Sequence, residues 1–411
     1  MRIAVWHNLP SGGGKRALYD QVRALRSAGH YVEAWCPPSA DQKFFPLSEY
    51  LKENVVSLRE RGAMPRGPLK RRIYFITDVI QRIAGMTEHC QQCAAAITEI
   101  GFDVLLVHPC RFFLTSPIAQ YVRIPSLLYL QEPARNFYEA LPSFPWAAPD
   151  RPFRKFSIRD WIWFLTETME LFGKRLQVRE EAKWARKFDQ VLVNSLFSRE
   201  SLVRVYNLDS RVCYLGIDTA NFTRSAAPKE PFVIGLGSLS FHKRPVFAVQ
   251  CIGTIPKEKR PKLVWVGNAG SADEARREAE KLGVEFEVRT LIPDAELKDL
   301  LSRAAVMIYA SHLEPFGYAP LEANACGTAV VALAEGGIRE TMNHPHCGVL
   351  IPNLDREAFG RALLSYCSDL SFAAEAGKNA RAYVENIWSN DSAAERLEQE
   401  IRRTILAKQV P

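Results

Sequence analysis

The sequence has no long apolar run. No window of its 411 residues approaches the roughly 18 uninterrupted apolar residues that a membrane-spanning helix requires. The N-terminal stretch MRIAVWHNLP carries one base and few apolar residues before Asn8 and Pro10, which is too short for a signal peptide. We therefore expect a cytoplasmic protein whose first residues form a β-strand.

The sequence also has no disulfide framework. Its nine cysteines are odd in number and scattered from Cys36 to Cys367. Only Cys90 and Cys93 are close together, in HCQQC beside His89, where a metal or redox site is one interpretation. No second Cys/His pair with zinc spacing completes such a site, and the segment has a helical pattern. We therefore favour reduced, structural cysteines.

Two motifs are missing as well, one that binds phosphate directly and one that binds it through a divalent metal ion. The stretch SGGGKRALYD (11–20) is not a Walker A loop, because Leu9 stands where the first glycine is required and Arg16 where Ser or Thr is required. No D-x-D occurs, so the usual carboxylate pair for a bridging divalent ion is absent. What remains is a glycine turn between a strand and a helix, whose backbone N–H groups can face an anion.

The formal net charge of +7 is unevenly distributed. A basic balance is compatible with nucleic acid, anionic lipid or phosphorylated substrates. One short segment holds Arg59, Arg61, Arg66, Lys70, Arg71 and Arg72, and the run that follows places Ile73, Ile76, Ile80 and Ile83 on one helical face. Two interpretations of the segment 59–83 stay open. It is a solvated basic loop leading into a core-facing helix, or a patch that faces anionic lipid or an anionic acceptor.

Strand and helix patterns alternate along the chain. Short apolar runs typical of buried parallel strands occupy 2–7, 31–36, 103–108, 126–131 and 190–195, and then 232–237, 262–268, 286–291, 304–311, 329–333 and 348–351. Amphipathic stretches such as ADEARREAEKLG and DAELKDLLSRA lie between them. This alternation predicts an α/β fold with parallel sheets covered by helices on both faces.

Two domains fit the two series of strands. A polar stretch rich in small residues separates the series, so we predict an N-terminal domain over 1–212 and a C-terminal domain over 213–385. The residues 386–411 follow as a long amphipathic helix with no strand after it.

An insertion over about 137–187 interrupts the first domain. Trp161, Trp163, Phe164 and Leu165 cluster there beside several bases. This segment either packs as core or as a lid, or it forms a surface that faces an acceptor or a membrane.

The strongest chemical signal is SHLEPFGYAPLEANACGTAVVALAEGG (311–337). Glu314 lies in the loop that follows a strand, and Glu322 lies eight residues later, about one turn into a helix. Between them, the backbone N–H groups near Gly317, Tyr318 and Ala319 point along the helix dipole. This arrangement suits a diphosphate flanked by two carboxylates that grip sugar hydroxyls.

A second glycine-rich turn, GLGSLSFHKRP (235–245), follows the first strand of the same domain. Lys243 and Arg244 in this turn could neutralise a diphosphate. The alternative is a solvated basic turn without a ligand.

These motifs together resemble the retaining glycosyltransferases of the GT-B fold, in the large family 4 type that includes sucrose and glycogen synthase relatives. The block E-P-F-G-x-x-P-L-E-A resembles that family's E-x7-E motif. The resemblance covers nearly the whole chain, and its further segments are SGGGKRALYDQVRALRSAGHYV, with Gly12 and Gly13 as paired glycines, DVLLVH, QVLVNSLFSRES, YLGIDTANF and WSNDSAAERL.

The resemblance implies two Rossmann-like domains with parallel sheets that face each other across a cleft, and a C-terminal helix that crosses back to the N-terminal domain. It implies transfer of a sugar, with retention, from a UDP- or GDP-linked donor to a hydroxyl of a glycan, a lipid-linked acceptor or a small molecule. It further implies no metal, no cofactor and no nucleic-acid partner, and a location in the cytoplasm, with peripheral membrane contact through 59–83 as an option.

The resemblance also implies roles for individual residues. Glu314 would hold sugar hydroxyls near the reacting carbon, Glu322 would bind the ribose, and the backbone near Ile292 would meet the base. His108 would position the donor sugar, although a core histidine is the alternative. The remaining donor-binding residues would be Gly13, Gly14, Ser238, Lys243, Arg244, Phe316, Gly317, Tyr318 and Ala319.

The chain departs from the family pattern at one phosphate position. Ser238 stands where the family commonly has an arginine. Either Arg244 replaces that arginine, or the phosphates depend on Lys243 and on backbone groups.

Two other function classes stay open. A sugar-nucleotide 2-epimerase has the same two-domain fold, but the E-P-F-G block and the aromatic insertion argue against it. A non-catalytic member that binds a sugar nucleotide is the other alternative, and the intact Glu314, Glu322, Lys243 and His108 argue against it.

Overall fold

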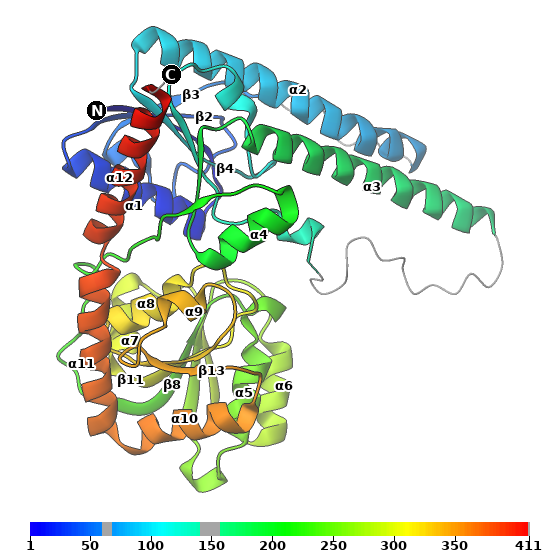
Figure 1. Cartoon of the computed structure of the whole chain (residues 1–411). Coiled ribbons are helices and arrows are strands. Elements are labelled where there is room, and N and C mark those ends of the chain that lie inside the picture. The colour runs from blue at the N-terminus through cyan, green and yellow to red at the C-terminus, as the bar shows by residue number, and fades with distance from the viewer. Residues whose placement is uncertain (60–67, 140–156, 410–411) are drawn as a thin grey trace. The chain divides into compact units, whose positions relative to one another are not determined.

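The computed structural model describes residues 1–59, 68–139 and 157–409, which form two compact units. The N-terminal unit consists of Met1–Val193, Ser198–Cys213 and Arg396–Pro411. The C-terminal unit consists of Asn194–Phe197 and Tyr214–Glu395. Each unit contains a parallel sheet flanked by helices (Figure 1).

Seven parallel strands form the sheet of the N-terminal unit within the described residues, in the order β3-β2-β1-β4-β5-β6-β7. Their bounds are β1 Arg2–Asn8, β2 Tyr31–Cys36, β3 Lys52–Val55, β4 Val104–Cys110, β5 Ser126–Tyr129, β6 Gln190–Val193 and β7 Arg211–Val212. The chain winds in one direction from β1 to β3 and in the other from β4 to β7. In such sheets a ligand binds outside the carboxyl ends of the strands at the reversal, which here is the β1/β4 pair.

The sheet of the C-terminal unit has six parallel strands in the described chain, in the order β10-β9-β8-β11-β12-β13. The strands are β8 Glu230–Leu236, β9 Lys262–Val266, β10 Phe286–Arg289, β11 Ala304–Tyr309, β12 Val330–Leu333 and β13 Gly348–Ile351. The order reverses between β8 and β11, which places the expected ligand crevice at the carboxyl ends of these two strands.

Helices separate most of the strands, as the alternating pattern predicts. The N-terminal unit contains α1 Gly13–Ser27, α2 Pro68–Ile100, α3 Ile158–Ala185 and most of α4 Leu196–Tyr206. The C-terminal unit contains α5 Pro245–Gly253, α6 Asp273–Leu282, α7 Asp294–Arg303, α8 Tyr318–Ala325, α9 Ile338–Thr341, α10 Arg356–Ser368 and α11 Leu370–Ile387. The last helix, α12, spans Asn390–Gln409.

The apolar strands build the core of each unit. All seven residues of β4 and all six of β11 are buried, as expected for central parallel strands with helices on both faces. Burying these side chains supplies the main favourable free energy of folding, about 25 cal/mol per Å² of apolar surface. The prediction of two parallel-sheet domains is therefore confirmed.

Two strands escaped the sequence analysis. β3 has the sequence KENV, and β7 has only two residues, so neither forms an apolar run. Both lie at the edges of the sheet, where strands are short and polar residues are tolerated.

The predicted closing helix is present as α12. Its residues Arg396–Pro411 group with the N-terminal unit, although the preceding residues group with the other one. Lys408 Nζ donates to the carbonyl of Ile124 (3.2 Å) and pairs with Asp189 (2.8 Å). Leu397 and Ile401 are fully buried. The last part of the chain thus completes the N-terminal unit.

Every cysteine is among the described residues and is a free thiol. Cys90 and Cys93 lie on α2 and pack in the core of the N-terminal unit. His89 accepts the indole N–H of Trp6 at 3.1 Å, and burial raises the pKa of Cys93 to about 12. These contacts favour the structural interpretation of HCQQC.

The basic segment 59–83 is only partly described. Residues 60–67, including Arg61 and Arg66, lie outside the described residues, and the side chains of Lys70, Arg71, Arg72, Ile73 and Ile76 do as well. Ile80 is 52% exposed, whereas Ile83 packs against the core, so the isoleucine face is not uniformly buried. None of the helices that are described is long and apolar enough to cross a membrane.

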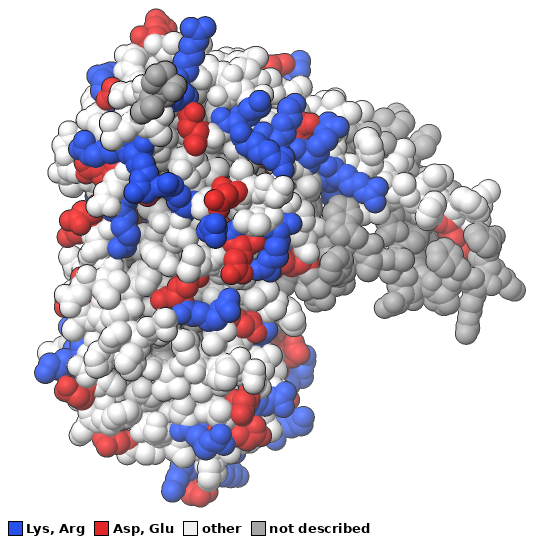
Figure 2. Space-filling model, viewed as in Figure 1, with Lys and Arg blue, Asp and Glu red and all other residues white. Residues whose placement is uncertain are grey.

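Helices α2 and α3 pack against each other along their lengths (Figure 1). From its first residue to its middle, α3 exposes Ile158, Trp161, Phe164, Leu165 and Phe172, which are between 48% and 82% accessible. Its second half carries the exposed bases Arg175, Arg179 and Lys183. Figure 2 shows Lys and Arg side chains gathered in this region, at the upper right of the view. The side chain of Trp163 and the loop 140–156 lie outside the described residues.

Candidate functional site

The E-P-F-G loop lies at the carboxyl ends of β8, β11 and β12. Glu314 Oε2 accepts three hydrogen bonds there, from Lys243 Nζ (2.5 Å), Ser311 Oγ (2.7 Å) and the Tyr309 hydroxyl (3.0 Å). The carboxylate is 22% exposed. Partial burial raises its pKa, but Lys243 and the two hydroxyls outweigh this effect and hold the pKa of Glu314 below its usual value. Glu314 is therefore a fixed, ionised carboxylate at the edge of the site.

Tyr309 links the two carboxylates that the sequence analysis singled out. It is the last residue of β11, and its hydroxyl also accepts a hydrogen bond from Lys243 Nζ at 3.2 Å. Burial and the negative charge of Glu314 raise its pKa well above the usual value, and Glu322 adds to that effect. Glu322 is 7% exposed on α8. Both carboxylates thus act electrostatically on one buried phenol.

The sequence analysis missed Tyr309 and Ser311. The only signal in the chain is a tyrosine at the end of the otherwise aliphatic strand AAVMIY. Buried tyrosines usually find a partner for the hydroxyl, so this position predicts a polar neighbour without identifying it.

Lys243 reaches Glu314 because the preceding turn is glycine-rich. Gly237 has φ +138°, and a Cβ at this residue would lie 3.2 Å from the Lys243 side chain. Trp265 Nε1 donates to the Gly237 carbonyl at 2.8 Å, which holds the turn in place. Ser238 Oγ contacts Ser240 Oγ at 2.9 Å. The lysine is 24% exposed, so its ammonium remains accessible.

Arg244 contacts other protein groups. Its guanidinium donates to the carbonyl of Ala310 (3.2 Å), to His312 Nδ1 (2.8 Å) and to the carboxylate of Glu335 (3.3 Å). Its backbone is left-handed, with φ 53°. These contacts tie together the loops that follow β8, β11 and β12. The family commonly has a phosphate-binding arginine where this chain has Ser238. The assignment of that role to Arg244 stays a prediction.

Helix α8 begins directly after the E-P-F-G loop. Gly317 is its N-cap with φ +98°, and no side chain caps the helix. The first N–H groups of a helix have no intrahelical partner and carry partial positive charge. Tyr318 and Ala319 are half-buried in this first turn, whereas Phe316 is 3% exposed with its ring 5.7 Å from that of Trp388. Phe316 therefore anchors the loop in the core.

A glycine pair in the A-E-G-G loop permits the position of Glu314. A Cβ on Gly336 would lie 2.4 Å from the carbonyl oxygen of Glu314, and one on Gly337 would lie 2.1 Å from that of Pro315. The Gly337 N–H donates to the Glu314 carbonyl at 2.8 Å. Only residues without a side chain allow this approach. The sequence alone shows the two glycines but not the loop that approaches them.

Ile292 lies beside an unusual exposed residue. Leu291 is 81% exposed with φ 53°, and its N–H donates to Asn268 Oδ1 at 2.7 Å. Ile292 itself is half-buried. The contact with the loop after β9 fixes the backbone at this point.

His108, Gly13 and Gly14 belong to the N-terminal unit, so the predicted residues form two separate groups. His108 is fully buried, and its ring stacks on Tyr129 with centroids 5.6 Å apart. Burial, followed by the nearby His7 and Lys15, lowers the pKa of His108 to about 3, so the imidazole is neutral. Gly13 and Gly14 begin α1, but the residue whose backbone requires glycine is Gly12, with φ +140°.

One group in the described residues has metal-ligating side chains close together. His7, Cys36 and Glu53 place their ligand atoms within 4.8 Å of one another. Burial, with Glu53 nearby, raises the pKa of the Cys36 thiol to about 12, which disfavours the thiolate that a metal needs. The ammonium of Lys15 also acts electrostatically on His7 and Glu53, which disfavours a divalent cation. The group therefore fits a metal poorly.

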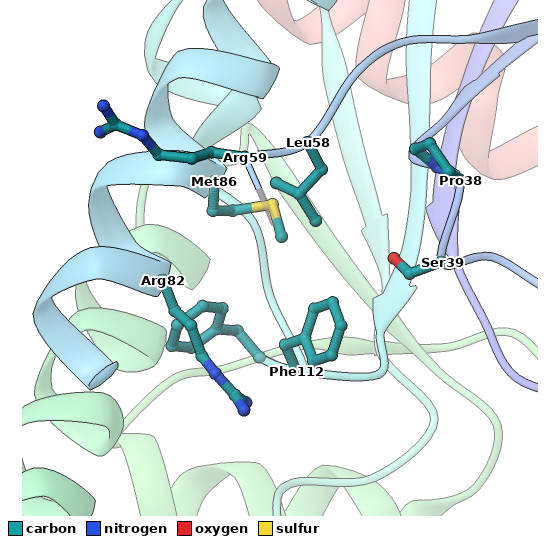
Figure 3. Close-up of a pocket in the computed structure, with 8 residues that line it drawn as sticks. Pro38, Ser39, Leu58, Arg59, Arg82, Met86 and Phe112 are labelled. Carbon is teal, nitrogen blue, oxygen red and sulfur yellow. The ribbon is translucent and has the colours of Figure 1, made fainter. Parts of the chain in front are cut away.

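The N-terminal unit also contains a pocket of about 250 Å³. Leu58, Met86 and Phe112 give it an apolar lining, and Ser39 stands on another side (Figure 3). Arg82 places its guanidinium 5.2 Å from the centre of the Phe112 ring, a cation–π arrangement. The pocket thus combines an apolar interior with cationic groups.

Residues 217–383 match the family model of glycosyl transferases group 1. This range contains Lys243, Ile292, Glu314 and Glu322. D-inositol 3-phosphate glycosyltransferase from Xylanimonas cellulosilytica is 30% identical over 235 residues, which are 51% of this chain and 56% of that protein. The protein of the same name from Mycobacterium sp. (strain KMS) is 33% identical over 187 residues, 41% of this chain and 42% of its own length. The chain thus matches only about half the length of these curated relatives.

Solved structures resemble the whole fold. Sucrose-phosphate synthase from Thermosynechococcus elongatus superposes with a TM-score of 0.69 at 19% identity, covering 99% of this chain and 100% of that one. HepE from Anabaena, solved in complex with UDP, gives a TM-score of 0.68 at 16% identity, covering 98% and 100%. At these identities the likeness concerns the fold, which is the GT-B fold with two Rossmann-like domains.

Proposed function

We propose that the chain is a retaining glycosyltransferase of the family 4 type, which moves a sugar from a nucleoside diphosphate sugar to an acceptor hydroxyl without a metal. The observation that carries this proposal is the hydrogen-bonded group of Lys243, Tyr309, Ser311 and Glu314 at the β8/β11 reversal. It lies within the residues that match the group 1 family model. The UDP and UDP-glucose complexes of HepE support a nucleotide sugar as the ligand class.

The diphosphate needs positive charge in a partly buried site. Lys243 supplies a formal charge, and the first turn of α8 supplies N–H groups and the positive end of a helix dipole. Gly317, Tyr318 and Ala319 contribute backbone there, while Ser238 offers a hydroxyl. In a metal-independent transfer, these groups would stabilise the negative charge that develops on the leaving diphosphate.

The two carboxylates would bind hydroxyl groups of the donor. In our proposal Glu314 holds hydroxyls of the transferred sugar and Glu322 holds the ribose, while the backbone near Ile292 meets the base. Donor binding would exchange partners at Lys243, because a diphosphate competes with Glu314 for the ammonium. Tyr309 and Ser311 would then keep Glu314 ionised and in place.

The N-terminal unit would contribute His108, Gly13 and Gly14. A neutral imidazole has one donor and one acceptor nitrogen, which suits a sugar hydroxyl. In the first turn of α1, Gly13 and Gly14 would offer backbone N–H groups to a phosphate. We favour a same-face substitution in which the departing phosphate deprotonates the acceptor, rather than a double displacement through a second carboxylate.

The acceptor would be a glycan, a lipid-linked molecule or a small molecule. The exposed apolar stripe on α3, followed by Arg175, Arg179 and Lys183, favours contact with an anionic membrane surface. Co-sedimentation tests this contact: the protein should bind anionic vesicles more strongly than neutral ones. Phe172→Ser should weaken that binding, and Leu202→Val, at a buried residue of the neighbouring helix α4, should not. Equal binding to both vesicle types would remove the proposed role of α3.

A panel of labelled nucleotide sugars tests the transferase proposal. We expect slow hydrolysis of one donor to free sugar and nucleotide, and Glu314→Gln should reduce it about 100-fold or more, because a charge aimed at the reacting sugar is lost. Glu285→Gln is the matched control, since Glu285 is 72% exposed in the same unit. Wild-type turnover by Glu314→Gln would overturn the site. Inversion at C2 without hydrolysis would favour an epimerase, and silence across the panel a non-catalytic protein.

A further inference from the structure

The first turn of α1 contains a buried lysine whose hydrogen-bonding capacity is unused. Lys15 is fully buried, and its ammonium has no hydrogen-bond partner among the residues that the structure describes. A buried charge without hydrogen bonds costs several kcal/mol, so such groups are paired or bind a ligand. Burial lowers the pKa of Lys15, and Glu53, Cys36 and Asp41 partly counteract that effect.

Glu53 does not use its hydrogen-bonding capacity on the lysine. Its Oε1 accepts from His7 Nε2 at 2.9 Å and from the Cys36 thiol at 3.4 Å. Glu53 therefore acts on Lys15 only through space. The three N–H donors of the ammonium remain for another partner.

Other unpaired polar groups surround the lysine. Both ring nitrogens of His108 and Nδ1 of His7 are buried without a partner in the described chain, and so is Nε2 of Gln131. Lys15 acts electrostatically on both histidines. A Cβ at Gly14 would lie 3.7 Å from Gln131 Nε2, so the amide of Gln131 borders the glycine turn.

These groups converge on one place in the sheet. His7 lies on β1, His108 on β4 and Gln131 just after β5, and β1, β4 and β5 are neighbours. Lys15 and Gly14 belong to the helix that follows β1. All of them therefore lie at the carboxyl ends of the strands beside the β1/β4 reversal, where α/β sheets bind ligands.

We propose that Lys15 anchors an oxyanion subsite in the N-terminal unit, which binds a phosphate or carboxylate group of the substrates. The surroundings have an excess of donors: three from the ammonium, two from the Gln131 amide and one from neutral His108. A phosphate has the several acceptor oxygens that such a set requires, and the N-terminus of α1 adds further N–H groups. The inference that the bound group belongs to a substrate rests on the proposed transferase function. The inference that the group is an oxyanion rests only on the unpaired donors around Lys15.

Two sources of the oxyanion are compatible with this chemistry. It is either the diphosphate of the donor or an anionic group on the acceptor. Three probes separate them, and each is added to the full-length protein: UDP, glucose 6-phosphate and inorganic phosphate. If Lys15→Met weakens the binding of UDP but not of the other two probes, the subsite belongs to the donor. If the substitution weakens the binding of glucose 6-phosphate and inorganic phosphate, the subsite belongs to an anionic acceptor.

The test compares Lys15→Met with Arg23→Met by thermal unfolding and titration calorimetry. Arg23 lies on the same helix, is half-buried and pairs with Asp20 at 3.5 Å, so it is the matched control. Wild type should be stabilised by at least one probe, and Lys15→Met should bind that probe about 10- to 100-fold more weakly, as expected for a lost charged hydrogen bond. Without anions, Lys15→Met should unfold at the same or a higher temperature, because methionine removes an unsatisfied buried charge.

Three results would overturn the proposal. The first is equal affinity of wild type and Lys15→Met for every probe. The second is a lower unfolding temperature of Lys15→Met in anion-free buffer, which would make the lysine structural. The third is stabilisation by Zn²⁺ but by none of the anions, which would make the neighbouring His7, Cys36 and Glu53 a cation site. None of these three results contradicts the transferase proposal, which is tested separately by the loss of donor hydrolysis in Glu314→Gln.

Discussion

The environment of Glu314 explains how one carboxylate stays charged in a partly buried site. Burial alone would favour the neutral acid, but one ammonium and two hydroxyls donate to the same oxygen. The carboxyl group therefore keeps its charge at any pH above its lowered pKa. In our proposal the diphosphate draws the Lys243 ammonium away when the substrate arrives, and the hydroxyls of Tyr309 and Ser311 remain as donors to Glu314.

Tyr309→Phe tests whether the phenol positions Glu314. The substitution removes one of three donors and leaves the ring in place, so we expect the protein to fold and donor turnover to fall about 10-fold, the equivalent of one hydrogen bond. The acid limb of the pH–rate profile should also move to higher pH, because the pKa of Glu314 rises. Tyr366→Phe, in the core of the same unit, is the control. An unchanged profile would show that Tyr309 is only packing.

His108 predicts a pH dependence of stability. Its pKa is about 3 in the folded chain and about 6.5 in the unfolded chain, so between these values the unfolded state binds a proton that the folded state does not. Stability should therefore fall as the pH is lowered from about 6.5 towards 3, by up to about 1.4 kcal/mol per pH unit from this group.

Chemical denaturation of His108→Gln at several pH values checks this prediction. The difference in unfolding free energy between wild type and variant should be largest and constant near neutral pH and should shrink as the pH falls. His344→Gln, which lies in the other unit and is not fully buried, serves as the control. A difference that does not change with pH would mean that His108 titrates normally in the folded protein.

At the scale of elements, the apolar runs predicted most of the strands because central parallel strands are buried on both faces. The apolar runs were not enough to predict the residues of the site. Gly336 and Gly337 matter because a second loop passes within contact distance of their α-carbons, and no local pattern reveals that neighbour. The same holds for Lys15, which the sequence presents as an ordinary first-turn base and the structure buries completely. Glu314 and Lys243 were predictable because they belong to compact motifs.

Gly317→Ala tests the junction between the E-P-F-G loop and α8. A Cβ at this residue would lie 2.2 Å from Ile338 Cδ1, and the φ of +98° is unfavourable for any other residue. We expect the unfolding free energy of the C-terminal unit to fall by about 1–3 kcal/mol, together with weaker donor binding.

A double variant separates the two causes of this loss. Combining Gly317→Ala with Ile338→Val removes the methyl group that clashes with the new Cβ. The double variant should regain the unfolding free energy lost through the clash, but not the free energy lost through the unfavourable φ. Gly29→Ala is the control, because Gly29 has φ +81° with open space around it, so only the backbone cost remains. If Gly317→Ala and Gly29→Ala lower the unfolding free energy by the same amount, the clash with Ile338 contributes nothing.

At the scale of the whole molecule, the two units are unequal in what the sequence reveals. The C-terminal unit contains the specific motifs and the match to a family model, whereas the N-terminal unit contains the pocket of Figure 3, the exposed stripe of α3 and the Lys15 cluster. In our proposal this unit binds the acceptor, and it contains no motif as specific as the E-P-F-G block. The unit that the sequence describes least well is the one that we expect to determine specificity.

The last helix makes the N-terminal unit depend on the end of the chain. Ile401 is fully buried on α12, whereas Leu406 on the same helix is 63% exposed. Ile401→Ala should therefore lower the unfolding free energy of the N-terminal unit by about 2–5 kcal/mol, and Leu406→Ala should change it by less than about 0.5 kcal/mol. Hydrogen exchange followed by mass spectrometry locates the effect, since peptides from β1, β4 and β5 should exchange faster and those from β8 and β11 should not. Faster exchange in both sets would mean that α12 supports the two sheets equally, against the grouping of Arg396–Pro411 with the first unit alone.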